Sequence, residues 1–241
     1  MIIHKDEQGS DSWLESRRGV ITGSRFRDCR DKLKNGKLSN AAMLYAQDVA
    51  RERCGGRAAP TFANAAMKFG TEQEPFARQA YEARTGNLVD EAGFITTDDG
   101  KFGVSVDGLV DDDGIIEIKT MVSSATLFRA VVDGDISDYV DQINGALWLL
   151  GRKWADLVLW APDMPEGARL TIVHIKRDDD VINALEADLI AFEATVTELE
   201  GKLRALLTVK ADEQQPELFP PSEPAAELKL VSPDDIVSIT F

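Results

Sequence analysis

Apolar residues recur at steps of three and four in several long segments of the chain, which is the spacing of one helix face. Residues 64–85 show this pattern, and a helix is expected there. Further helices are predicted at about 137–151 and at about 179–207. The positions expected on the inward faces of the first two helices are Met67, Gly70, Glu74, Ala77 and Tyr81, and Val140, Ile143, Leu147 and Leu150.

Shorter segments between these helices are typical of strands. They lie at 92–97, 101–106, 114–120, 155–160 and 169–176. The second and third are separated by Asp111-Asp112-Asp113-Gly114, a strong turn signal. Ahead of them we expect a short helix at 12–18, a turn at 19–24 and a basic helical stretch to about Arg53. Helices and strands therefore mix in one α/β domain, which we place at residues 1–210.

Residues 211–241 differ from the rest, because acids, proline and glutamine replace the apolar pattern. Such a segment offers too little apolar surface to offset the entropy lost on ordering. We expect an acidic, Pro-containing C-terminal tail. Its last residues, 234–241, fit either a short strand or a docking peptide.

The composition narrows the class of protein. Of 241 residues, 44% are hydrophobic, which is enough for a substantial core. The longest apolar run, Ala146–Leu150, is far shorter than the roughly 20 residues that span a bilayer. An early acidic N-terminus argues against a secretory signal, and two cysteines, Cys29 and Cys54, fit a reducing compartment. We therefore expect a cytoplasmic protein, in which any metal is a hard ion held by oxygens rather than by Cys or His clusters.

The charge is distributed unevenly. The net charge is −15, with +4 in residues 1–60, −13 in 61–210 and −6 in 211–241. Net negative charge opposes non-specific binding of nucleic acid, but a local basic patch still holds phosphates. We expect low affinity for random DNA surface, together with a confined binding site.

The most informative spacing joins Asp107 to Glu117-Ile118-Lys119. In a strand at 115–119, Ile116 and Ile118 share one face, and Glu117 and Lys119 share the other. A hairpin would return Asp107 beside Glu117, so that two carboxylates and an ammonium group converge. Carboxylate oxygens suit Mg²⁺ or Mn²⁺, and the lysine is placed to orient or deprotonate an attacking water. The alternative is an amphipathic hairpin with solvated charges.

Residues on two predicted helices join this group. Glu74 lies on an apolar-leaning face, where a carboxylate costs free energy unless it is paired or bound to metal. Tyr139 and Gln142 stand three apart and share a helix face. The glutamine is suited to hold a water or a phosphate oxygen. The alternatives are a surface glutamate at 74 and a buried, satisfied amide at 142.

A phosphate site is predicted near the N-terminus. Trp13, Arg17 and Ser24 surround a glycine-containing turn that enters a helix. Arginine makes forked contacts with phosphate, and helix N-termini offer free N–H groups. The alternative is a capping serine beside a surface arginine.

Four blocks of the sequence resemble the phage lambda exonuclease (YqaJ-type viral recombinase) family, in family order from residue 9 to about 160. The first block runs through Trp13 and Arg17 to Ser24, and the second is Gly70-Thr71-Glu72-Gln73-Glu74-Pro75. The third joins Ser105-Val106-Asp107-Gly108-Leu109 to Glu117-Ile118-Lys119. The fourth joins Tyr139-Val140-Asp141-Gln142 to Trp148–Lys153.

The resemblance implies a restriction-endonuclease-like (PD-(D/E)xK) α/β core, with a mixed central sheet flanked by helices. It implies that Asp107, Glu117, the Ile118 carbonyl and Glu74 form the metal site. Lys119 and Gln142 would act on the water. It further implies that Arg17, Ser24 and Ser105 hold the 5′-phosphate, with Trp13 and Tyr139 beside the DNA. Val106 and Thr120-Met121 depart from the family pattern of proline before the aspartate and Cys-Pro after the lysine.

By the same resemblance, the chain is expected to be a Mg²⁺-dependent (or Mn²⁺-dependent) exonuclease with two ions per site. It would degrade one strand of linear duplex DNA from 5′ to 3′, releasing mononucleotides, as a homotrimer working with a single-strand annealing protein. The alternatives are a non-catalytic DNA-end-binding recombination module and a structure-specific endonuclease.

One motif in the tail points to a further partner. Gln215–Phe219 resembles the Gln-x-x-Leu-Phe peptide that docks on the bacterial sliding clamp. A flexible segment that presents Leu-Phe to an apolar groove is physically sensible. The alternative is a tail whose Leu-Phe pair folds back on the domain.

Overall fold

The computed structural model describes residues 1–6, 9–57 and 65–213, without the side chains of 209–213. The contacts of the chain divide it into two units, Met1–Arg204 and Ala205–Phe241. The first unit contains every element discussed below except the end of the last helix, which continues past Arg204 to Glu213. The predicted clamp peptide and most of the predicted tail lie outside the described residues.

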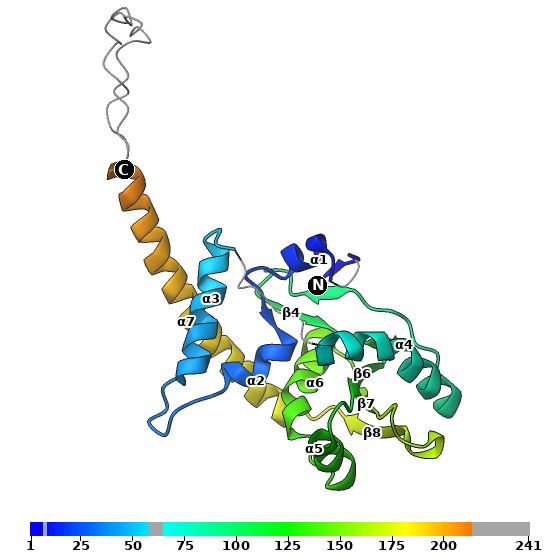
Figure 1. Cartoon of the computed structure of the whole chain (residues 1–241). Coiled ribbons are helices and arrows are strands. Elements are labelled where there is room, and N and C mark those ends of the chain that lie inside the picture. Colours follow the sequence, from blue (N-terminus) through cyan, green and yellow to red (C-terminus); the bar gives the residue numbers. More distant parts are fainter. Residues whose placement is uncertain (7–8, 58–64, 214–241) are drawn as a thin grey trace, which may run out of the picture. The chain divides into compact units, whose positions relative to one another are not determined.

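The first unit contains a four-stranded sheet. Its order is β5 (Gly108–Val110), β6 (Gly114–Thr120), β7 (Trp154–Trp160) and β8 (Leu170–Lys176), of which β6, β7 and β8 are labelled in Figure 1. β6 and β7 are parallel, and the two outer pairs are antiparallel. A parallel pair needs a long crossover, and this crossover contains helix α6 (Ser137–Leu150).

A second four-stranded sheet has the order β1 (Ile2–His4), β3 (Phe94–Thr96), β4 (Phe102–Ser105) and β2 (Ile21–Thr22). The sequence did not predict β1, β2 or β5, because two or three residues are too few to show a period of two. The strand expected at 101–106 ends at Ser105, and Asp107 lies between β4 and β5. Asp107 therefore stands where the chain passes from one sheet to the other.

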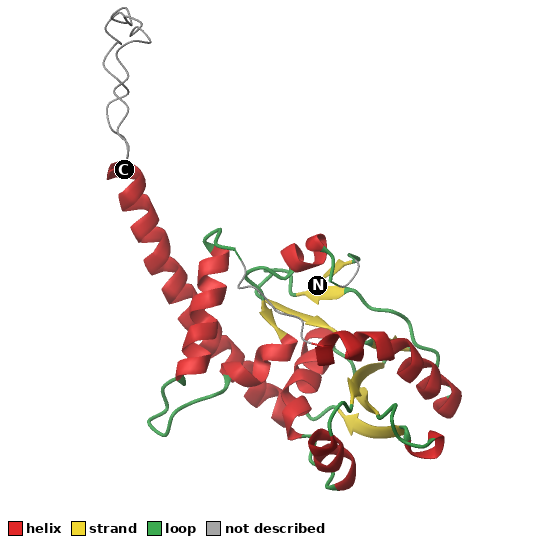
Figure 2. Cartoon of the chain, in the orientation of Figure 1, coloured by secondary structure: helices red, strands yellow, loops and turns green. Residues whose placement is uncertain are grey.

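Helices flank the strands (Figure 2). Ala77 and Tyr81 of α4 (Ala65–Thr85) pack in one cluster with Ile116 and Ile118 of β6. Ile115 of the same strand belongs to the other cluster, which contains Ile143 and Leu147 of α6. The two faces of β6 alternate as the sequence predicted, and the structure adds that one face meets α4 and the other meets α6. Glu117 and Lys119 share the α6 side.

The remaining helices are short, apart from two. They are α1 (Asp11–Ser16), the 3₁₀ helix η1 (Gly23–Arg25), α2 (Phe26–Cys29), α3 (Asn40–Arg53), α5 (Ser124–Leu127), the π-helix η2 (Phe128–Val132), the 3₁₀ helix η3 (Glu166–Ala168) and α7 (Asp179–Glu213). Within the described residues, no helix combines the length and apolar character needed to cross a bilayer.

The basic helical stretch expected up to Arg53 is correct at its two ends, in α2 and α3, and wrong between them. The chain leaves α2 at Cys29 and forms a loop with a bridge between Lys32 and Leu38. Gly36 in that loop has φ +80°, which favours glycine and is incompatible with an uninterrupted helix through this segment. Ser39 then starts α3, where its side chain accepts a hydrogen bond from the Ala42 N–H.

The inward face predicted for α6 is only partly correct. Ile143 and Leu147 are buried, but Val140 and Leu150 are half-exposed. Gly145 is buried instead, and a Cβ there would lie 2.1 Å from Phe26 Cδ2. Because α2 covers this additional side of α6, its buried arc is wider than a single apolar stripe.

Candidate active site

Three side chains form a closed triangle where β6 faces α6. Lys119 Nζ lies 2.7 Å from Glu117 Oε1, and Gln142 Nε2 donates to the same oxygen at 2.5 Å. Lys119 Nζ also donates to Gln142 Oε1 at 3.2 Å. The Glu117 side chain is 4% exposed. The alternative of a solvated hairpin is therefore wrong at Glu117, and the Gln142 amide is satisfied by charged groups of the site.

Asp107 lies beside this triangle. Its Oδ2 accepts a hydrogen bond of 2.6 Å from the Ile118 N–H, and its carbonyl accepts one of 3.0 Å from Arg78 Nη2. Burial, and then the charge of Glu117, raise the pKa of Asp107 well above its usual value. Burial lowers the pKa of Lys119, but the carboxylates of Glu117 and Asp107 outweigh this and raise it. The site concentrates negative charge that a cation would stabilise.

Glu74 of α4 lines the same cleft as Asp107 and Glu117. Burial raises its pKa, Arg78 opposes that shift, and Glu117 adds to it. Among the described residues, no three Asp, Glu, His or Cys side chains gather closely enough to form a ready metal cage. A role of Glu74 in holding metal stays a prediction.

The donors present fit a hard divalent cation. Asp107 and Glu117 bring carboxylate oxygens into one cleft, and Ile118 lines it between them. Oxygen donors of this kind suit Mg²⁺ and Mn²⁺. One oxygen of Glu117 is shared with Lys119 and Gln142, so a cation there would compete with the lysine for that carboxylate.

Arg17 lines the same cleft and is held there by aromatic rings and a serine. Its guanidinium Cζ lies 4.4 Å from the ring centroid of Trp13 and 4.9 Å from that of Phe94. Arg17 Nη1 donates to Ser105 Oγ at 3.2 Å, and burial lowers the pKa of the arginine. A guanidinium stacked between two rings presents its fork in a fixed plane, which suits a phosphate.

A cleft of about 490 Å³ unites the predicted residues. Ten of them line it: Trp13, Arg17, Ser24, Glu74, Ser105, Asp107, Glu117, Ile118, Lys119 and Gln142. Tyr139 lies next to the cleft, with its ring centroid 5.8 Å from Lys119 Nζ. Ser24 is not a capping serine, because it lies inside η1, whose N-cap is Thr22.

Several residues of this site were not predicted from the sequence. Arg78 follows Glu74 by four positions, so the helical spacing would have placed both on one face. The side chain of Thr71 forms a hydrogen bond with Glu74, and the sequence predicted no role for it beyond its place in the Gly70–Pro75 block. Phe94 gave no signal, because it reaches Arg17 from a strand far along the sequence.

A larger hollow, of about 700 Å³, lies along the C-terminal half of α4. Phe76, Arg84, Trp160 and Arg169 are among its lining residues, and none of the predicted site residues is. The smaller cleft is the better candidate active site, because it contains the paired carboxylates, the lysine and the stacked arginine.

Comparisons with known proteins agree with this assignment. Residues 12–153 match the model of the YqaJ-like viral recombinase domain. An alkaline exonuclease (LHK-Exo) from Laribacter hongkongensis is 32% identical, with a TM-score of 0.73 over 85% of this chain and all of that chain. The structure of LHK-Exo in complex with dAMP matches equally well. A comparison with curated proteins finds no match.

A phage-related exonuclease from Haemophilus somnus shares the fold. It is 17% identical, with a TM-score of 0.64 over 76% of this chain and 96% of that chain. The restriction-endonuclease-like α/β fold expected from the sequence is confirmed, with the second sheet as an addition to the predicted central one. The family model covers more than half of the chain, from α1 to the start of β7. The chain therefore belongs to the YqaJ-like viral recombinase family.

Proposed function

We propose that this protein is a deoxyribonuclease that degrades one strand of linear duplex DNA from its 5′ end, with Mg²⁺ as cofactor. Membership in a family of nucleases, and the likeness to an alkaline exonuclease, support the exonuclease activity. The polarity, the metal and the release of mononucleotides are proposed from the family resemblance and from the chemistry of the cleft.

One observation carries the proposal. A single cleft is lined by the carboxylates of Asp107 and Glu117 with Lys119, and also by Arg17, which donates to Ser105. The first group suits hydrolysis of a phosphodiester, and the second suits binding of a terminal phosphate. A site that binds the end phosphate and hydrolyses a nearby linkage acts on DNA ends.

The side chains divide the work. Asp107, Glu117 and the Ile118 carbonyl would hold the metal, which when bound lowers the pKa of water and offsets charge at phosphorus. Lys119 orients the attacking water and stabilises negative charge on the phosphoryl oxygens, while Gln142 keeps Lys119 and Glu117 in register. Arg17, Ser24 and Ser105 bind the 5′-phosphate, and Trp13 fixes the plane of Arg17.

The proposed assembly is a homotrimer around DNA, which works in the cytoplasm of a bacterial host with a phage or prophage single-strand annealing protein. A ring with its acidic surface outward would reconcile a net charge of −15 with a DNA substrate. Docking of Gln215–Phe219 on a sliding clamp is a separate proposal about residues outside the described part.

End-labelled duplex digestion tests the proposed activity. We expect Mg²⁺-dependent shortening of linear duplex from 5′-phosphorylated ends, loss of activity on chelation, and no cutting of closed circular duplex. Cutting of the closed circle would favour the endonuclease alternative. Binding of linear ends without digestion under any divalent ion would favour the non-catalytic module.

The variant Glu117→Gln separates chemistry from folding. It retains the size of the side chain but removes the charge that holds Lys119 at 2.7 Å. We expect at least about a 100-fold loss of digestion, with unchanged binding of DNA ends. Full digestion by this variant would refute the assignment of the active site.

A further inference from the structure

Three residues of α3 form hydrogen bonds with the backbone of residues 17–24, the segment proposed to bind the phosphate. On the basis of the proposed function, we propose that Tyr45, Glu52 and Arg53 are positioning residues that set the preference for 5′-phosphorylated ends. They bond the backbone of the segment whose side chains, Arg17 and Ser24, line the cleft.

Gly19 is held at both of its backbone polar groups. Its N–H donates to Glu52 Oε2 at 2.9 Å, and its carbonyl accepts from Arg53 Nε at 2.7 Å. The turn is closed by the Val20 N–H, which donates to the Arg17 carbonyl at 3.1 Å. Gly19 has φ +72°, and a Cβ there would lie 2.8 Å from Arg53 Cγ. The position therefore fits glycine alone, and the two α3 side chains fix the direction in which the chain leaves Arg17.

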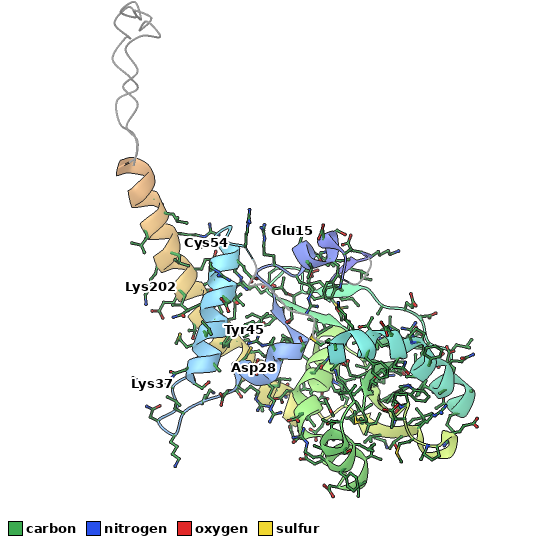
Figure 3. The ribbon with its side chains drawn as sticks, viewed as in Figure 1. Glu15, Asp28, Lys37, Tyr45, Cys54 and Lys202 are labelled. Carbon is green, nitrogen blue, oxygen red and sulfur yellow. The ribbon has the colours of Figure 1, made fainter. Side chains whose placement is uncertain are left out.

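A second anchor lies three residues further on. The Thr22 N–H donates to the Tyr45 hydroxyl at 3.1 Å in a buried position. Figure 3 labels Tyr45 beside the middle of α3. Burial raises the pKa of Tyr45 to about 12, so the hydroxyl is neutral and its oxygen accepts this hydrogen bond. Because Thr22 directly precedes the helical turn that contains Ser24, Tyr45 fixes where that turn begins.

The opposite side of the segment is fixed by the second sheet. The Ile21 N–H donates to the Lys101 carbonyl, and β2 pairs with β4 in parallel. A Cβ on Gly23 would lie 2.9 Å from Val104 Cγ1. The segment is thus confined between α3 and β4, and a change in α3 shifts Arg17 relative to Ser105 at the end of β4.

Arg53 of α3 is itself held by an ion pair with α7, and this ion pair costs desolvation free energy. Glu193 of α7 pairs with Arg53 Nη1 at 2.9 Å and with Lys101 Nζ at 3.1 Å, and its side chain is 8% exposed. Within the described residues, Arg53 Nη2 and Glu193 Oε2 are buried without hydrogen-bond partners. Buried charges with unsatisfied atoms add little net stability. A role in positioning gives a reason for keeping them.

The test compares binding of duplexes that differ in one group, the 5′-phosphate. Affinities for phosphorylated and hydroxyl ends are measured by fluorescence anisotropy in chelator, where no hydrolysis occurs, and digestion rates are measured with Mg²⁺. The ratio of the two affinities reports the phosphate pocket independently of chemistry. It is compared among the native chain, Glu52→Ala, Glu52→Gln and Tyr45→Phe.

We expect Glu52→Ala and Tyr45→Phe each to lower the phosphate preference about tenfold, the effect of losing one well-placed hydrogen bond. Glu52→Gln retains an acceptor oxygen and should restore most of the preference. The matched control is Tyr81→Phe, which removes another buried tyrosine hydroxyl, on α4; this hydroxyl donates to Asp156 at 2.7 Å and accepts from Asn87 Nδ2 at 3.2 Å. It should lower thermal stability without changing the ratio.

The outcomes separate the two proposals. Unchanged phosphate preference in both Glu52→Ala and Tyr45→Phe would overturn the positioning role, as would an equal loss in Tyr81→Phe. A native chain that prefers phosphorylated ends but digests no DNA would contradict the proposed function, and a loss of that preference in Glu52→Ala and Tyr45→Phe would then still support the positioning role. A native chain with no phosphate preference would overturn the positioning role, whether or not it is a nuclease.

Discussion

At the scale of single residues, the site depends on charges that are held close together out of water. Glu117 is almost fully buried and contacts both Lys119 and Gln142. A buried carboxylate is costly unless it is paired. In this site the pairing partner is also the group proposed to act on water, so stability and chemistry rest on the same contact.

Lys119→Met removes the ammonium group and retains most of the side-chain volume. We expect linear duplex digestion to fall by at least about 100-fold, because the site loses the ammonium group proposed to orient the water and to stabilise charge on the phosphoryl oxygens. Rates of single-turnover digestion would measure the change. Lys153→Met is the matched control, because Lys153 is 71% exposed and pairs with Asp113 just before β7. Comparable losses in both variants would contradict the role of Lys119.

Gly19→Ala measures how strongly the turn at Gly19 requires glycine. The positive φ alone should cost roughly 1–2 kcal/mol of unfolding free energy. The contact with Arg53 Cγ should add about 1 kcal/mol or more. Urea denaturation measures both effects together.

Gly36→Ala is the control for this strain, because Gly36 has φ +80° and nothing lies within 4 Å of the position that a Cβ would occupy there. It should show the cost of the dihedral angle without the contact. Equal losses in the two variants would mean that Arg53 yields, and that the turn is not sterically confined.

At the scale of elements, the β6–α6–β7 crossover creates the site. It lays α6 against the face of β6 that carries Glu117 and Lys119, so Gln142 meets them from a distant part of the chain. Arg30, which directly follows α2, also links α6 to α7 through two ion pairs. Arg30 Nη1 pairs with Asp141 at 2.7 Å, and Arg30 Nε pairs with Asp188 at 3.0 Å.

Asp188 makes the ion pairs between α7 and the end of α2 sensitive to acid. Burial raises its pKa, but hydrogen bonds from Lys32 and Arg30 outweigh this and lower it. A carboxyl whose folded-state pKa is lowered contributes stability above its unfolded pKa, and loses it as pH falls through the folded value. Asp188→Asn should therefore cost about 1 kcal/mol of unfolding free energy at neutral pH, and much less near pH 2.

Urea denaturation at several pH values measures the difference between Asp188→Asn and the native chain. Asp113→Asn, which breaks the exposed pair with Lys153, is the control and should change stability by less than about 0.5 kcal/mol. A difference for Asp188→Asn that is constant across pH would show that the carboxylate charge does not stabilise the contact between α7 and the end of α2.

At the scale of the whole molecule, the net charge of −15 restricts how DNA is bound. Acidic surface repels phosphates, so affinity must come from the cleft and from the ends that fit it. Linear duplex with 5′-phosphates should compete for binding at least about tenfold better than closed circular duplex of the same length. Equal competition would mean that the protein binds along the duplex and that the cleft does not select ends.

The chemistry of the site followed from local spacing. The pair Asp107 and Glu117-Ile118-Lys119 predicted a convergence that the β5–β6 hairpin produces, because the turn between short strands restores the register. The helix predicted at 64–85 is found at Ala65–Thr85, because its pattern is long, but Met67, expected on its inward face, is 57% exposed. Predictions were wrong where the pattern was short or ambiguous, as in the helix expected up to Arg53 and in the strands β1, β2 and β5.

The sequence by itself determined the residue types, their order along the chain and the family to which they belong, since these depend on neighbours a few positions apart. Tertiary structure decided which distant residues complete the site: Phe94 against Arg17, Gln142 between Glu117 and Lys119, and Arg53 on Gly19. Such contacts join residues from separate elements. The packing of helices on sheets decides which of these distant residues meet, and local sequence patterns do not predict it.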